Sequence, residues 1–331
     1  MLKVTDTAGP IKIGIYLDRK FSIVPFINAI DPLRMANRIC DEKLFEWTLI
    51  SRDGRPVEAI NGMSIVADCS LKDAGYFPNA ICCVGFEPVL SVGAPVKSWL
   101  RMLDSKGAHL GALGAGSIFL AEAGLLDGYR ATIHWQFLDS FIETYPRIEA
   151  TRNLFEIDRD RFTCAGGTAA MDLVLHLISV HFGHNVAAEV SDQFIMGEIR
   201  NAENTQRASN RFRLGITNPR VLQVVDLMEG NIEDPIPISR LAAQVGISQR
   251  QLERMFKEHV KTSAVRYYRR IRLLHARRLL LQSELPLIEV AVASGFGSLE
   301  HFSRTYKAEF GKSPHEDRRP GMTISTRRVL A

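Results

Sequence analysis

The sequence predicts two domains of different fold class: an N-terminal α/β domain with a doubly wound parallel sheet, and an all-α C-terminal domain with two helix-turn-helix units. Three observations lead to this prediction. The chain has 331 residues, which is more than one ordinary core holds. Its first 180 residues alternate short β-rich runs with helical patterns. Its last third contains an internal repeat and carries the excess of basic charge.

Four β-rich runs mark the expected sheet: Ile11–Leu17, 47–51, 81–84 and 110–113. The last two are continuous apolar runs, which are typical of parallel strands covered on both faces. Because helical patterns separate the runs, the sheet should be parallel, with helices packed on both of its sides.

Two of the intervening helices have clear sequence patterns. Apolar residues repeat at helical spacing from residue 23 to residue 33 after a possible N-cap, Ser22, and Pro32 is expected to kink or end this helix. The second helix is expected over residues 168–182, after the Gly166-Gly167 turn. Both should cover the sheet.

The composition excludes several classes of protein. With 46% apolar and 24% charged residues, the chain should fold rather than remain disordered. It has no apolar run long enough for a membrane span, and its first ten residues lack the apolar core of a secretory signal, so a cytoplasmic location is expected. The five cysteines form no CxxC pair, and neither a disulfide framework, a metal site nor a cofactor is predicted.

A polar segment separates the two expected domains. The stretch from residue 197 to 219 is poor in large apolar residues and is interpreted as a linker. The chain is expected to have five parts: an N-terminal arm at 1–10, the α/β domain at 11–195, the linker at 196–218, the helix-turn-helix domain at 219–318 and a tail at 319–331.

Charge is distributed unevenly between these parts. Residues 219–331 carry 19 lysines and arginines against 12 acidic residues, a net charge of +7, whereas the rest of the chain carries 22 against 25. A basic module is what contact with nucleic-acid phosphates requires. On charge alone, a solvated basic surface explains the same numbers.

The internal repeat is the strongest signal in the basic third. Ser248, Leu252, Arg254, Phe256, Val260 and Ser263 match Ser298, Phe302, Arg304, Tyr306, Phe310 and Ser313 at a constant offset of 50. Each copy has a short helix, a glycine turn, a serine N-cap and a second helix, which is the helix-turn-helix pattern. A long helical pattern, Ala264–Gln282, should space the two copies rigidly.

The second helix of each copy is expected to enter the major groove of double-stranded DNA, because its outward side chains are long and polar. In the first copy Glu253 is also expected to point outward. The predicted DNA-binding residues are Gln249, Arg250, Gln251, Arg254, Ser298, Glu300, His301, Arg304 and Lys307. The alternative is a charged, solvated helix without a ligand.

The amino-acid sequence of the repeat also resembles that of a known family. LAAQVGISQRQLERMFKEHV, followed by VAVASGFGSLEHFSRTYKAEFGKSP, resembles the DNA-binding domain of AraC/XylS transcription regulators over about residues 219 to 318. The resemblance implies sequence-specific binding to a promoter or operator.

The N-terminal domain contains a strand, a glycine turn and a helix at LGALGAGSIFLAEAGLLDGYRATIHW, the pattern of a nucleophile elbow. This stretch and TCAGGTAAMDLVLHLI resemble the flavodoxin-like, class I glutamine amidotransferase-like (PfpI-type) domain that precedes the DNA-binding domain in one AraC subgroup. In catalytic relatives the turn carries a cysteine, with a histidine about twenty residues later. The resemblance places Gly114 at the cysteine position and His134 at the histidine position.

No covalent catalysis is therefore expected. Gly114 has no side chain, and Ser22 stands where catalytic relatives carry a supporting carboxylate. Ser117 is an alternative nucleophile near His134, but it is expected inside the helix and not at its turn. The domain is therefore not expected to be an enzyme. It is expected to keep a pocket at the carboxyl ends of its strands.

The pocket should suit a ligand carboxylate, because backbone amides at the start of a helix attract anions. DPLRMAN, YRATIHW and LFEIDRDRFTCAGGTAAMDL resemble the branch that senses glycine betaine, carnitine and related amines, or arginine. A quaternary ammonium would need an aromatic face, for which Trp135, Phe86 and Phe21 are candidates, although core packing is the favoured explanation for each single aromatic. The predicted ligand-binding residues are Gly85, Phe86, Glu87, Gly114, Ala115, Gly116, Ser117, His134 and Trp135.

The sequence thus predicts a transcription regulator, an activator, that binds double-stranded DNA under the control of a small zwitterionic effector. A homodimer is expected, RNA polymerase is a possible partner, and no membrane is involved. Two alternatives remain: an active amidohydrolase or protease fused to a DNA-binding domain, and an architectural DNA binder that needs no ligand.

Overall fold

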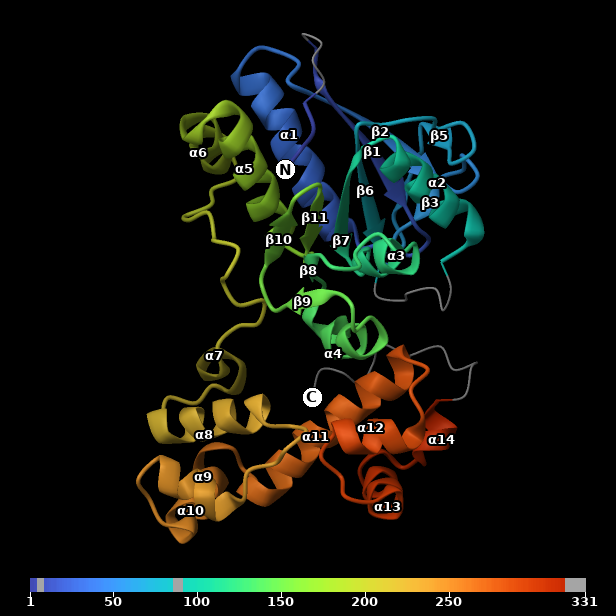
Figure 1. Cartoon of the computed structure of the whole chain (residues 1–331). Coiled ribbons are helices and arrows are strands. Elements are labelled where there is room, and N and C mark those ends of the chain that lie inside the picture. The colour runs from blue at the N-terminus through green and yellow to red at the C-terminus, as the bar shows by residue number, and fades with distance from the viewer. Residues whose placement is uncertain (5–8, 86–91, 319–331) are drawn as a thin grey trace. The chain divides into compact units, whose positions relative to one another are not determined.

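A computed structural model describes residues 1–4, 9–85 and 92–318 (Figure 1). It divides into two compact units, Met1–Arg207 and Ala208–Ala331, so the division falls inside the segment 196–218 that the sequence marks as polar. No helix in these described ranges combines the length and apolar character that crossing a membrane demands. Each unit is described separately below.

The first unit is built on a seven-stranded sheet in the order β10-β11-β7-β6-β1-β2-β5. All neighbouring strands are parallel except β10 and β11, which pair antiparallel at one edge. The strands of the sheet are β1 Ile11–Leu17, β2 Phe45–Ser51, β5 Cys69–Ser70, β6 Asn79–Val84, β7 His109–Gly114, β10 Phe155–Asp158 and β11 Arg161–Cys164. Two small sheets pair β3 Val57–Glu58 with β4 Ser64–Ile65, and β8 Arg130–Thr132 with β9 Glu149–Thr151. The parallel sheet confirms the predicted fold class.

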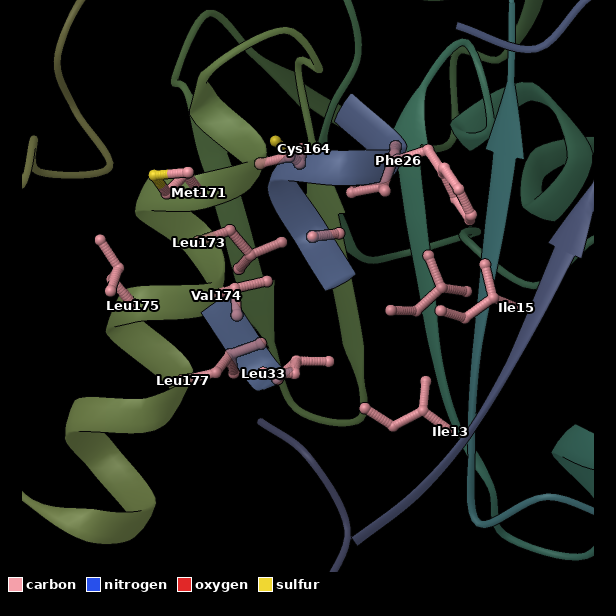
Figure 2. Packing of buried hydrophobic residues seen from close by; sticks show 14 of the residues in the cluster. Ile13, Ile15, Phe26, Leu33, Cys164, Met171, Leu173, Val174, Leu175 and Leu177 are labelled. Atoms are coloured by element: carbon pink, nitrogen blue, oxygen red, sulfur yellow. The ribbon is translucent and has the colours of Figure 1, made fainter. Parts of the chain in front are cut away.

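Helices cover both faces of this sheet, as predicted (Figure 1). They are α1 Ile23–Ile39, α2 Ala94–Ser105, α3 Ser117–Glu122, α4 Trp135–Thr144, α5 Ala169–Phe182 and α6 His184–Gln193. One core packs α1, α5 and α6 against the sheet, and a second packs α2, α3 and α4 against the opposite face. Figure 2 shows part of the first core, where Leu33 of α1 lies beside Val174 of α5 and the side chains of Ile13 and Ile15 extend from β1 toward the helices.

Helix α1 does not end at Pro32, which was one of the two outcomes expected there. It continues through Pro32 to Ile39. A proline inside a helix costs one backbone hydrogen bond and about 3 kcal/mol. Residues on both sides of it, among them Phe26 and Leu33, are buried in the same core. Burial of each such side chain contributes about 1.5 to 3 kcal/mol, so packing outweighs the loss at the proline.

The second unit is entirely helical in its described part. Its helices are α7 Asn210–Leu214, α8 Pro219–Gly230, α9 Ile238–Gln244, α10 Gln249–His259, α11 Ala264–Gln282, α12 Leu287–Ala293, α13 Leu299–Phe310 and α14 Pro314–Asp317. The helices α9 and α10 form the first helix-turn-helix unit, and α12 and α13 form the second. Each helix-turn-helix unit has its own apolar core, and α11 contributes residues to both cores. The long helix therefore joins the two units, as the sequence predicts.

The two copies repeat each other in burial as well as in sequence. Residues 251–264 and 301–314 have the same order of buried, half-buried and exposed positions, one by one. Leu252 and Phe256 are fully buried in the first copy, and Phe302 and Tyr306 are fully buried in the second. The offset of 50 in the sequence is therefore an offset between equivalent structural positions.

Candidate ligand pocket and DNA-reading helices

A small pocket lies at the carboxyl ends of β6, β7 and β11 in the first unit. This is the edge of a parallel sheet where ligands usually bind. Its walls are Ser22, Pro25, Val84, Gly85, Gly114, Ala115, His134, Phe137, Ala165, Gly166 and Gly167. Four of the predicted ligand-binding residues, Gly85, Gly114, Ala115 and His134, are among these walls.

Three helices begin at this pocket. Ser22 is the N-cap of α1 and His134 is the N-cap of α4. Gly166 and Gly167 immediately precede Thr168, the N-cap of α5. The first backbone amides of a helix have no partner inside the helix, and the helix dipole is positive at this end. Their convergence makes the pocket attractive to an anion such as a carboxylate.

Gly114 occupies the turn between β7 and α3. Its φ of +65° lies in the left-handed region, and a Cβ placed there would lie 3.3 Å from the Val84 carbonyl oxygen. The predicted strand, tight turn and helix are thus present: β7 ends at Gly114 and α3 begins at Ser117. The turn presents only backbone to the pocket at this position, so the position offers no nucleophile.

His134 forms another part of the pocket wall, next to this turn. Its backbone N–H donates to the Gly114 carbonyl at 3.4 Å, and its Nδ1 accepts from the Gln136 backbone N–H at 3.3 Å. An accepting Nδ1 assigns the ring proton to Nε2. Burial lowers the pKa of His134 to about 4, so the ring is neutral at pH 7. A neutral imidazole in this position can donate a hydrogen bond to a ligand oxygen.

The other candidate nucleophiles near this edge are not activated. Burial raises the pKa of the Cys82 and Cys83 thiols well above the ordinary value, and it raises the pKa of Cys164 to about 12. Ser117 is fully buried as the first residue of α3, and its Oγ donates to the Thr132 carbonyl at 2.7 Å. Sequence reasoning placed Ser117 farther inside the helix, but its hydroxyl is nonetheless committed to the backbone.

The remaining predicted ligand residues are either absent from the pocket lining or not described by the structure. Gly116 and Ser117 do not line the pocket, and Phe86 and Glu87 lie outside the described residues. Trp135 is half-buried, and the Arg207 guanidinium lies 4.7 Å from the centre of its ring. Phe21 is fully buried, with its ring 5.4 Å from that of Phe26, so it is a core residue.

The pocket is small and partly open to solvent. Its cavity volume of about 10 Å³ holds about one water molecule. A ligand as large as an amino acid therefore needs more space than this cavity offers. In the described ranges, no group of three or more histidine, cysteine, aspartate or glutamate side chains is placed to hold a metal ion.

The second candidate site consists of the helices α10 and α13. All nine predicted DNA-binding residues are exposed. Two of them also stabilise helix ends: Gln251 forms a reciprocal capping box with Ser248, and Ser298 Oγ accepts from the His301 backbone N–H at 3.3 Å. Arg254 and Arg304 occupy equivalent exposed positions, one in each copy.

The structure corrects the prediction that Glu253 points outward from α10. It is only half-exposed, and its carboxylate accepts from the Ala264 backbone N–H at 3.0 Å. It therefore caps the first turn of α11 and fixes the angle between the recognition helix and the connecting helix. Sequence reasoning missed this role because the partner is a backbone amide eleven residues away.

These features define a class of protein: a regulator with a paired helix-turn-helix DNA-binding domain and a separate pocket-bearing α/β domain. Comparisons with known proteins agree with this class. Residues 241–320 match the model described as a helix-turn-helix domain, and residues 12–180 match that of the DJ-1/PfpI family. The chain is 43% identical over 298 residues to the HTH-type transcriptional regulator CdhR of Pseudomonas aeruginosa, covering 90% of this chain and 88% of that protein.

Two further comparisons extend this result. The chain is 41% identical to the HTH-type transcriptional regulator GbdR of P. aeruginosa, covering 94% of this chain and 84% of that protein. A crystal structure of an AraC family transcriptional regulator from Pseudomonas putida has 30% identity and a TM-score of 0.52, covering 56% of this chain and all of that one. The chain belongs to the AraC-family transcriptional regulators that carry an N-terminal DJ-1/PfpI domain, and it binds DNA through its helix-turn-helix domain.

Proposed function

We propose that this regulator changes its affinity for DNA when a small zwitterionic metabolite binds in the pocket of the first unit. The observation that carries the proposal is the convergence of three helix N-termini on a cavity whose turn has no nucleophilic side chain. The ligand carboxylate is expected to face these helix ends and His134. The domain is proposed to sense this ligand without transforming it.

The resemblance to the sensing branch suggests glycine betaine, carnitine and arginine as the first compounds to test. Each of them joins a carboxylate to a positively charged group. Because the cavity holds only about one water molecule, we propose that binding is accompanied by movement of a wall. We propose further that the protein acts as an activator in the form of a homodimer, with RNA polymerase as its partner at the promoter.

The test of the ligand class is a thermal-shift screen of the full chain. All three tryptophans, Trp47, Trp99 and Trp135, are in the first unit, so tryptophan fluorescence follows that unit alone. A ligand at a hundredfold excess over its dissociation constant should stabilise the unit by about 2.7 kcal/mol. Choline is the matched control, because it carries the quaternary ammonium of betaine without the carboxylate. The proposal fails if choline stabilises the unit as well as betaine does and no carboxylate compound does better.

The pH dependence of stability tests the environment assigned to His134. Since burial holds its pKa near 4, below the ordinary value of 6.5, the unfolded chain binds a proton more readily than the folded one between these values. The contribution is fully present above pH 6.5 and is lost as the pH falls toward 4. Between pH 7 and pH 4.5, wild type should lose about 2 to 3 kcal/mol more than His134→Gln in chemical denaturation followed by tryptophan fluorescence. Equal losses in the two proteins would contradict a buried, neutral His134.

The enzymatic alternative has its own test. An active amidohydrolase would release ammonia or cleave a peptide, and His134→Ala would abolish that activity. We expect no turnover to depend on His134, because the buried thiols and Ser117 are not available as nucleophiles. Turnover that His134→Ala abolishes would overturn the proposal of a sensing domain.

A further inference from the structure

The segment from Met196 to Arg207 is bound along the first unit. Met196, Ile199 and Ala202 pack against the first core of this unit. The Leu154 backbone N–H donates to the Ala202 carbonyl at 2.7 Å. This segment leads directly into the second unit at Ala208, so its path determines where the connection to the DNA-binding domain leaves the first unit.

One end of the segment is fixed by an ion pair. The Arg200 backbone N–H donates to Asp172 Oδ1 at 2.8 Å, and its guanidinium donates to Asp172 Oδ2 through Nε at 3.1 Å and Nη2 at 2.6 Å. Nη2 also donates to Thr168 Oγ1 at 2.7 Å. Asp172 is fully buried, and breaking a buried pair leaves an uncompensated charge. Arg200 therefore anchors this end of the segment to the first unit.

The other end is held through Gln206 and Arg207. The Gln206 amide Nε2 lies 3.0 Å from Thr132 Oγ1, 3.0 Å from the Ile133 carbonyl and 2.8 Å from the Asn153 carbonyl. Two N–H bonds are thus shared among three acceptors. Gln206 Oε1 is buried without a hydrogen-bond partner in the described part of the chain, which makes docking costly. The Arg207 guanidinium stacks on the Trp135 ring at 4.7 Å.

This end contacts the two residues on either side of a pocket-lining residue. Gln206 contacts the carbonyl of Ile133, and Arg207 contacts the ring of Trp135. His134, between these two residues, lines the pocket. The same three-residue turn therefore faces the ligand cavity on one side and holds the connecting segment on the other.

We propose that Gln206 and Arg207 form a latch whose docking on residues 132–135 depends on the position of the pocket wall at His134. The proposal rests on the proposed function, because the ligand is what would move this wall. A ligand that displaces His134 changes the Ile133 and Trp135 contacts together and releases or tightens the latch. The Arg200 anchor confines the resulting freedom to the residues that lead into the DNA-binding domain.

The experiment is limited tryptic cleavage of the full chain at the Arg207–Ala208 bond, followed by mass spectrometry. Ala208 and Ser209 are exposed, so docking of the latch is what should limit cleavage. Gln206→Leu removes the three contacts at nearly the same size and should accelerate cleavage about tenfold. Glu203→Ala, at an exposed position of the same segment, is the control and should leave the rate unchanged.

The dependence on the pocket wall is tested with a second pair of variants. His134→Ala should accelerate cleavage about threefold or more, whereas Ile142→Ala, at an exposed position of α4 outside the pocket, should not. His134→Gln replaces His134→Ala if the alanine variant does not fold. Wild-type rates in the folded His134 variants would overturn the latch, and so would equal acceleration by Ile142→Ala. A ligand screen without a binder would instead contradict the proposed function, so the two failures are distinguishable.

Discussion

The two helix-turn-helix copies have equivalent buried positions but differ in their turns and exposed surfaces. Their buried positions correspond one by one over residues 251–264 and 301–314. The exposed residue after the first helical position is Arg250 in the first copy and Glu300 in the second. Interior positions are thus constrained by packing, whereas surface positions are set by what each copy must contact. The two copies should bind DNA in similar orientations while reading different bases.

The turns differ in their surroundings. At Gly246 in the first copy, φ is +69° and an added Cβ would have no heavy atom within 4 Å. At Gly295 in the second copy, φ is +72° and an added Cβ would lie 2.5 Å from the Ile232 carbonyl oxygen and 2.6 Å from Pro235 Cγ. Arg272 Nε also donates to the Ser294 carbonyl at 2.9 Å, and its guanidinium stacks on Phe296 at 4.5 Å. The second turn is therefore packed into the domain and the first is open.

The largest predicted effect comes from substituting the glycines in the two turns. Gly295→Ala should destabilise the C-terminal unit by about 3 to 5 kcal/mol, because left-handed strain and overpacking both act there. Gly246→Ala should cost only the strain, about 1 to 2 kcal/mol. Native-state hydrogen exchange of residues 219–318 in the full chain measures both values. Equal costs would show that the packing around Gly295 does not matter.

The next effect concerns the equivalent arginines. Arg254→Ala and Arg304→Ala should each weaken binding to a specific DNA site by about 1 to 3 kcal/mol if they read bases. An arginine that contacts only phosphate should instead weaken all sequences alike and lower the salt slope by about 1. Titrations on specific and unrelated duplexes at several salt concentrations separate the two roles. Unchanged affinity in both variants would contradict the assignment of α10 and α13 as the DNA-reading helices.

The smallest predicted effect comes from substituting the residue that follows the recognition helix of the first copy. Lys261, after α10, has a φ of +62°, whereas the equivalent position after α13 is Gly311 with a φ of +74°. Lys261→Gly should remove left-handed strain and stabilise the first copy by about 0.5 to 1 kcal/mol, the entropy of glycine in the unfolded chain offsetting part of the gain. Hydrogen exchange in α10 measures this change. Destabilisation would mean that the bond from Lys261 Nζ to the Glu258 carbonyl, at 2.8 Å, contributes more than the strain costs.

The parts of the molecule that could be predicted depend on short-range chemistry. Serine caps, glycine turns and apolar spacing are local signals, and the structure confirms the caps Ser248 and Ser298 and the full extent of Ala264–Gln282. The main parallel strands were predictable for the same reason. The short strands β3 to β5 and β8 to β11 were missed, because two to four residues carry too little periodicity.

The parts that could not be predicted depend on partners far apart in the sequence. Arg200 and Asp172 are 28 residues apart, and Gln206 contacts backbone carbonyls more than 50 residues away. A backbone carbonyl has no sequence signature, so residues 196–207 appeared to be only a polar linker. The pocket was predictable where a motif marks it, at Gly114 and His134. Its other walls, at Gly166 and Gly167, follow from the fold, which brings the start of α5 to the same edge.

Selection of DNA from a random-sequence library by the full chain tests the central claim most directly. Two rigidly joined recognition helices in successive major grooves should enrich a motif of two conserved blocks, with centres about 10 base pairs apart. Arg254→Ala should degrade one block and Arg304→Ala the other. Enrichment of no sequence, or of a single block that responds to neither substitution, would contradict a domain that reads DNA with two helix-turn-helix units.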